Sequence, residues 1–188
     1  MKKLITIILI ISLLLPAASL AESNYSPHLQ MTIQEYIIKY NSIQAALDSP
    51  YVSIDNPYSW SDWEGFHIAW FYADKDHKTS ILLMTKDPSY GKKLTAGLDQ
   101  IQIYSNDQEF VSLISVATRC SQIFSADILG TSLASKRVAD VICYYFENNC
   151  KAKNLIAYQG LDENNECVLS FYYSGNYTFN ILLLEDMQ

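Results

Sequence analysis

The chain has 188 residues, of which 49% are hydrophobic and 18% are charged, and its formal net charge is −7. That composition is typical of one folded domain and argues against an intrinsically disordered chain. An acidic surface repels nucleic-acid phosphates and anionic lipid head groups, and the basic pairs Lys92-Lys93 and Lys136-Arg137 are isolated, so we expect no nucleic-acid partner.

The N-terminus has the order of a secretory signal peptide. Lys2 and Lys3 precede a mainly apolar run, Leu4–Leu15, and the small residues Ser19 and Ala21 follow it. This sequence of a positive end, an apolar core and a small-residue exit predicts cleavage after Ala21. The apolar run is shorter than the roughly 20 residues that span a bilayer, so an uncleaved anchor is the weaker interpretation.

Cleavage after Ala21 defines the mature chain. It leaves 167 residues with a net charge near −9, because both lysines of the leader are removed. No cysteine follows the cut, so a bacterial lipid anchor is not expected. We expect a secreted or periplasmic soluble protein with no stable membrane insertion, organised as a signal peptide (1–21), a flexible leader (22–30) and one domain (31–188).

The first part of the mature chain predicts one helix followed by three strands. Thr32 and Glu35 form a capping box, and apolar residues then recur at helical spacing over 32–48. A loop rich in proline, serine and aromatic residues follows at 50–64. Alternating or apolar runs between turn signals predict strands over 66–72, 80–85 and 98–104.

The second part predicts two helices and three more strands. Asn106 and Glu109 form a second capping box, before helices over about 106–124 and 133–148. Strands are predicted over 154–159, 168–173 and 177–184, joined by polar turns. The order α-βββ-αα-βββ indicates the α+β class, with antiparallel sheet packed against three helices.

Two segments of the chain show a weak sequence similarity to each other. The tripeptide at 68–70, Ile-Ala-Trp, matches Ile-Ala-Tyr at 156–158, with an aspartate in each following turn, Asp74 and Asp162. The helices do not keep this offset of 88 residues. Two interpretations stay open, a duplicated half and a chance similarity between hairpins.

Four cysteines, Cys120, Cys143, Cys150 and Cys167, lie in the mature chain and allow three pairings in an oxidising compartment. If the two C-terminal helices form an antiparallel hairpin, Cys120 and Cys143 are the favoured disulfide pair. The alternative is a set of buried thiols. The cysteines contain no C-x-x-C spacing, which argues against zinc and thioredoxin-like chemistry.

The segment 58–67 holds the densest candidate site. It brings together Tyr58, Trp60, Asp62, Trp63, Glu64 and His67. Aromatic rings beside carboxylates suit sugar rings or peptides. The aromatic rings cover C–H surface, while the carboxylate oxygens accept hydrogen bonds from hydroxyls or amides. The structural alternative is that the tryptophans close one end of the core and the carboxylates stay in water.

A catalytic hypothesis rests on Asp62, Glu64 and His67, since two carboxyls can flank a glycosidic bond. We find no G-x-S-x-G, no metal-ligand spacing and no glycine-rich phosphate loop, so no cofactor or metal is expected. In the strand 66–72, His67 alternates with Phe66 and Ile68 and is expected on the opposite side from them, at the surface or hydrogen-bonded.

A tyrosine-rich sheet face is the second candidate for binding. If Tyr72, Tyr158, Tyr172 and Tyr177 line one uncovered face, that face suits a protein or peptide, because tyrosine is enriched at interfaces. Together with the loop, the binding candidates are Tyr58, Trp60, Asp62, Trp63, Trp70, Tyr72 and Tyr172.

Three function classes follow from these patterns. The leading one is an exported module that binds a protein, peptide or glycan of the bacterial envelope or extracellular space. The second is a small hydrolase of envelope polymers acting through Asp62, Glu64 and His67. The third is a structural subunit of an envelope complex. The lack of a nucleophile, metal or phosphate motif favours binding over catalysis.

The leader gives the first testable prediction. Protein recovered from its native host should begin at Glu22, because the segment before it has the order that signal peptidase requires. Intact-mass measurement and N-terminal sequencing check this. Native protein that begins at Met1 and stays in the cytosol would contradict it.

Overall fold

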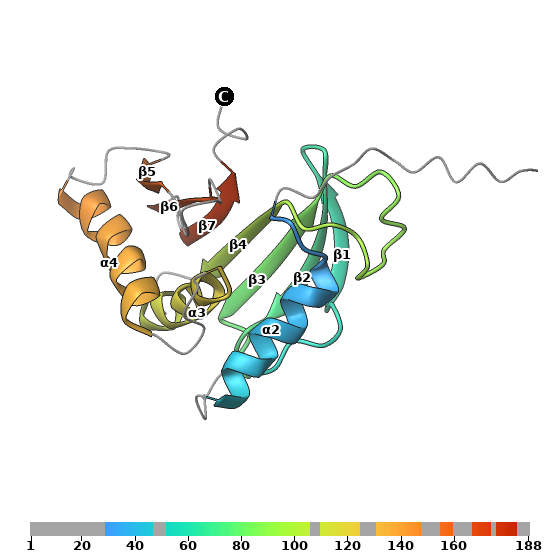
Figure 1. The fold of residues 1–188 in the computed structure, drawn as a ribbon, viewed down its shortest axis with the longest axis horizontal. Coiled ribbons are helices and arrows are strands. Elements are labelled where there is room, and N and C mark those ends of the chain that lie inside the picture. The colour runs from blue at the N-terminus through green and yellow to red at the C-terminus, as the bar shows by residue number, and fades with distance from the viewer. Residues whose placement is uncertain are drawn as a thin grey trace, which may run out of the picture.

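The computed structural model describes residues 29–46, 52–105, 110–124, 131–147, 155–159, 167–173 and 176–183. The described residues form three helices and one seven-stranded antiparallel sheet, so the predicted α+β class is confirmed (Figure 1). The elements are α2 (Ile33–Ala46), β1 (Ser59–Trp63), β2 (Phe66–Tyr72), β3 (Thr79–Thr85), β4 (Gln100–Ser105), α3 (Phe110–Gln122), α4 (Thr131–Glu147), β5 (Leu155–Gln159), β6 (Cys167–Tyr173) and β7 (Tyr177–Leu183).

The sheet has the strand order β1-β2-β3-β4-β7-β6-β5. The central pair is β4 with β7, in which Ile103 lies opposite Phe179 and Ile101 opposite Ile181. On one side the strands run β4, β3, β2, and on the other side they run β7, β6, β5. The two similar sequence segments, at 68–70 in β2 and 156–158 in β5, therefore occupy equivalent positions in the sheet. The topology is therefore compatible with two related halves, and duplication and chance similarity both stay open.

The capping box at the start of α2 is confirmed. The Thr32 amide donates to Glu35 Oε2 at 2.7 Å, and the Glu35 amide donates to Thr32 Oγ1 at 3.1 Å. These bonds satisfy amides that lack partners inside the helix. The hydrogen bond from the Thr32 backbone, followed by that from its side chain, lowers the pKa of Glu35. The second predicted box, at Asn106 and Glu109, lies outside the described residues.

All three helices pack on one side of the sheet, which we call the helix-covered face. Its strand residues alternate with those of the opposite side, the second face. One core joins α2, α3 and α4 to the inward residues of the strands, which are Ala69, Phe71, Ile81, Leu83, Ile101, Ile103, Leu169, Phe171, Phe179 and Ile181. Within the described chain, α3 lies against β4 and β7, and α4 against β5 and β6.

Aromatic contacts close the core between α3, α4 and the C-terminal strands. The ring centroids of Phe110 and Tyr177 lie 4.8 Å apart, and those of Tyr145 and Phe171, which meet edge to face, lie 5.0 Å apart. Edge-to-face and tilted pairs of this kind add to the free energy of simple burial. Tyr177 thus belongs to the helix-covered face, and the predicted face of four tyrosines is wrong in this respect.

Two sequence-based boundaries are corrected. The predicted loop 50–64 contains β1, which pairs along its whole length with β2. The sequence did not predict this strand because it contains serines and other polar residues. An edge strand can be this polar, since it does not need an apolar side on both faces of the sheet. Leu29, placed in the flexible leader, is buried, and its amide donates to the Leu98 carbonyl at 2.9 Å.

The strand β2 alternates as predicted, with His67 opposite to Phe66 and Ile68. The side of His67 is nevertheless the helix-covered face, where Ala69 and Phe71 are buried against the helices. Apolar bulk alone does not identify the inner face here, because Trp70 and Tyr72 on the second face are larger than Ala69.

The favoured disulfide between Cys120 and Cys143 is absent. Both cysteines are free: Cys120 is buried on the inner side of α3, while Cys143 is exposed on α4. The two helices are neighbours. Val141 and Ile142 are buried, whereas Cys143, which follows them in the sequence, lies on the outward side of the helix. Cys150 and the side chain of Cys167 lie outside the described residues.

No helix in the described part of the chain is both long enough and apolar enough to cross a bilayer.

The environments of the two described cysteines predict different reactivities. Burial raises the pKa of the Cys120 thiol to about 12, and since the thiolate is the nucleophile, Cys120 should react with maleimide ~1,000-fold more slowly than an ordinary exposed thiol at neutral pH. In a Cys150→Ser, Cys167→Ser background, mass spectrometry should find Cys143 labelled first and Cys120 labelled after unfolding. Protection of both residues that is lost on reduction would indicate the disulfide instead.

Candidate functional site

A tight hairpin places the candidate residues. Glu64 and Gly65 connect β1 to β2 between the paired residues Trp63 and Phe66, and both have positive φ, 48° and 83°. A two-residue connection with two positive φ angles matches the twist of the adjoining strands. Gly65 adopts this conformation without strain, and nothing lies within 4 Å of where its Cβ would be.

The hairpin register brings Asp62 and His67 together. They are opposed on β1 and β2, and Asp62 Oδ1 lies 2.5 Å from His67 Nδ1. An ionised carboxylate can only accept, so the ring N–H donates. Five residues apart in sequence, the two side chains meet because opposed residues of antiparallel strands point to the same face.

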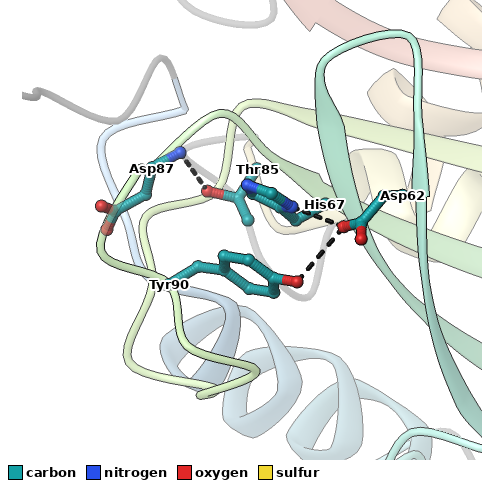
Figure 2. A network of polar contacts seen from close by, with 5 residues as sticks. All are labelled: Asp62, His67, Thr85, Asp87 and Tyr90. Carbon is teal, nitrogen blue, oxygen red and sulfur yellow. Dashed lines mark hydrogen bonds and ion pairs between the residues drawn. The ribbon is translucent and has the colours of Figure 1, made fainter.

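Tyr90 completes this pair from the segment that follows β3 (Figure 2). Its hydroxyl donates to Asp62 Oδ1 at 3.2 Å, and its ring stacks on His67 with centroids 3.6 Å apart and planes 14° from parallel. Trp60, on the same face of β1, lies 6.0 Å from the Tyr90 ring. We call Trp60, Asp62, His67 and Tyr90 the hairpin cluster.

The segment that carries Tyr90 is held by its own hydrogen bonds. The Asp87 amide donates to Thr85 Oγ1 at 3.0 Å, as Figure 2 shows, and the Ser89 amide and hydroxyl donate to Asp87 Oδ1 at 2.8 and 2.7 Å. Burial acts to raise the pKa of Asp87, but the hydrogen bonds from Ser89 and Gly97, with the nearby His67, outweigh it and the pKa is lowered.

The protonation of the hairpin cluster follows from these contacts. The hydrogen bond from His67 is the largest cause of the lowered pKa of Asp62, and it outweighs partial desolvation. Desolvation, followed by the hydrogen bond to Asp62, raises the pKa of Tyr90. Asp62 is therefore an anion at neutral pH, and Tyr90 a neutral phenol.

The polar groups around the cluster have separate environments. Glu64 lies in the turn beside Trp63 and, within the described residues, its carboxylate makes no hydrogen bond or ion pair, and its catalytic role with Asp62 stays a prediction. Thr85 is opposite His67 but is buried, and its hydroxyl oxygen accepts the Asp87 amide. No described serine, threonine or cysteine is hydrogen-bonded to His67. No described group of three or more metal-binding residue types could hold a metal ion.

The second face carries a separate set of rings. Tyr72 is the centre of this set. Its ring centroid lies 4.9 Å from that of Tyr58, 6.4 Å from that of Trp70 and 4.0 Å from that of His77, and the His77 ring stacks on it almost in parallel. We call these four residues the aromatic row. Tyr58 is 69% exposed. Among the described residues, the buried Trp70 indole N–H has no hydrogen-bond acceptor, and an unsatisfied buried donor costs about 1–3 kcal/mol.

The remaining predicted binding residues are spread more widely. Trp63 is 55% exposed beside the hairpin turn, where Lys86 lies over the ring of its partner Phe66 at 4.7 Å. Tyr172 lies on β6, with β3, β4 and β7 between it and β2. The side chain of Tyr158 lies outside the described residues. The hairpin thus carries the site, and Tyr172 does not join it.

Two members of these clusters were missed by sequence reasoning. Tyr90 and His77 come from turns, where no periodicity marks a contact with a distant strand. A better signal existed for the hairpin itself: Glu64-Gly65 between two aromatic residues is a turn pattern, and Trp60 and Asp62 alternate with Ser59 and Ser61.

The pKa of Asp62 gives a pH-dependent prediction. Because its pKa is lower in the folded chain, ionised Asp62 stabilises the fold above the ordinary pKa of an aspartate, and this is lost as pH falls through the lower folded value. Urea unfolding should therefore show Asp62→Asn less stable than wild type at pH 7, with a gap that closes in acid. Asp76→Asn, at an exposed turn, is the control and should show no such dependence. A gap that persists at acid pH would contradict the assignment.

Comparison with known proteins adds no relative to this geometry. No protein-family model matches the chain, no curated protein matches it, and no solved structure matches it. The chemistry of the hairpin residues is therefore the basis for assigning a role.

Proposed function

We propose that this chain is an exported binding module of the bacterial envelope or extracellular space, which holds a partner protein or peptide at the β1–β2 hairpin. The observation that carries this proposal is the pair of exposed aromatic side chains on the hairpin, Tyr58 and Trp63. Such side chains contribute large contact areas with few rotatable bonds and are enriched at protein interfaces.

Clustering distinguishes Tyr58 from a scattered surface residue. Tyr58 belongs to the aromatic row with Trp70 and Tyr72, so a partner would meet continuous ring surface. Single exposed apolar residues are common on any protein, whereas a patch indicates recognition. The rings are also held on a hairpin whose register is fixed by the turn and by the contact of Asp62 with His67.

Rigidity matters because ordering a loop on binding lowers affinity. Tyr90 ties the hairpin to the segment after β3 through Asp62 and His67. The hairpin cluster then acts as a support that keeps the exposed rings in place. This accounts for a carboxylate–imidazole contact without requiring catalysis.

Alanine substitutions test the binding role. Envelope extract from the native host is passed over immobilised protein, and bound partners are quantified by mass spectrometry. Tyr58→Ala combined with Trp63→Ala should reduce specific capture by roughly tenfold or more, since buried aromatic anchors dominate interface energy. Tyr173→Ala removes an aromatic ring that is 44% exposed on a distant strand and should change nothing. Equal losses, or none with the hairpin variant, would contradict the proposal.

A second candidate, hydrolysis of an envelope polymer, is favoured by the 2.5 Å contact of Asp62 with His67. Here Asp62 would orient the imidazole as a general base. Product release from envelope polymers should then fall by ~10²-fold or more in Asp62→Asn. The binding module predicts no turnover from either protein. A structural subunit would instead co-purify stoichiometrically with one partner and be indifferent to Asp62.

A further inference from the structure

The outer edge of β1 has no partner in the described part of the chain. β1 ends the sheet order and pairs with β2 alone. The outer side of an edge strand presents unpaired backbone N–H and C=O groups, which an added strand can bind. We propose that β1 is a docking edge for an extended segment of a partner protein that carries lysine or arginine at alternate positions. This inference rests on the proposed binding function and specifies its ligand.

The exposure of β1 supports this use of its edge. Its last three residues, Ser61, Asp62 and Trp63, are all exposed, although they point to opposite faces of the sheet. Among the described helices and strands, only β2 packs extensively against β1. The hairpin is already ordered by its two-residue turn and by the Asp62–His67–Tyr90 contacts. An incoming strand would therefore find its template preformed.

The charge of the edge selects the occupant. Asp62, whose side chain is 67% exposed, and Glu64, also exposed, are acidic, and the segment 59–65 contains no basic residue. Opposite charges across strands attract, and like charges directly opposite repel. A second copy of this chain would bring carboxylates together under a net charge of −7 per chain. A basic segment would be attracted instead.

Neighbouring lysines do not neutralise this edge. The Lys86 ammonium lies over the Phe66 ring at 4.7 Å. Lys92 contributes to the lowered pKa of Asp62, but less than the hydrogen bond from His67 does. The exposed Glu64 carboxylate makes no ion pair in the described chain, so it is available to an incoming cation.

The side chains of β1 also set a pattern for the added strand. Asp62 lies on the helix-covered face, while Trp63 lies on the second face. Residues of a strand alternate between faces, so the occupant would alternate basic residues, on the side of Asp62, with apolar residues, on the side of Trp63. Lysine alternating with valine is the simplest sequence with this chemistry.

Three synthetic peptides test the proposal on the protein expressed from its complete coding sequence. The probe is a lysine–valine peptide of about nine residues, long enough to span β1 at ~3.3 Å per residue. The second replaces lysine with glutamate, and the third carries N-methyl groups on alternate amides of the lysine peptide. Binding is followed by tryptophan fluorescence, and hydrogen exchange is followed at the β1 amides.

The expected result is binding of the lysine–valine peptide with slower exchange in β1. The glutamate and N-methylated peptides should bind at least ~tenfold more weakly, because one loses charge attraction and the other loses backbone pairing. Glu64→Lys should weaken binding of the lysine peptide by about fivefold. Lysine is compatible with that backbone, since Lys92 adopts a similar positive φ of 57°. Asp76→Lys, in the β2–β3 turn, is the matched control and should have no effect.

Several outcomes would overturn this inference. They are equal binding of the glutamate or N-methylated peptide, no protection of β1 amides, no binding, and a dimer formed through β1 in the peptide-free protein. If these occur while Tyr58→Ala with Trp63→Ala still abolishes partner capture, the edge mechanism fails and the binding module stands. If neither experiment shows hairpin-dependent binding, both proposals fail.

Discussion

The pairing of β4 with β7 is the constraint on which the rest of the structure depends. Through it, Ile103 and Phe179, 76 positions apart in sequence, become direct neighbours on the helix-covered face. The pair joins two groups of strands into one sheet and lets all three helices share one core. Contacts between such distant residues are slow to form, because a long loop must close before any contact stabilises it.

Placing three helices on one face determines what the other surfaces can do. The core takes its inward residues from every described strand whose side chains are visible except β1, whose Trp60 packs only at the margin. The second face retains large half-exposed rings, and in the described part of the chain the sheet ends at β1 with no further strand beside it. Within the described residues, the hairpin therefore presents aromatic side chains, carboxylates and a sheet edge together.

The contacts within the hairpin cluster tie the β1–β2 hairpin to the segment that follows β3. Asp62 accepts from both His67 and Tyr90, and the Tyr90 ring covers one side of the imidazole. The hydroxyl opposite His67, on Thr85, is buried and accepts a hydrogen bond from the Asp87 amide. These contacts help to hold the register of β1 on β2.

Local patterns alone determined the class of the protein and most of its elements. The capping box at Thr32 and Glu35 and the strand at 66–72 follow from period and turn chemistry within a few residues. Tertiary structure decided that β1 is a strand, that Ala69 and Phe71 rather than Trp70 face the core, that Cys120 and Cys143 stay apart, and that Tyr90 reaches Asp62. The physical reason is that a sequence period records which residues share a side, whereas the choice of the inner side, and of the distant segment that meets it, depends on how the whole core packs.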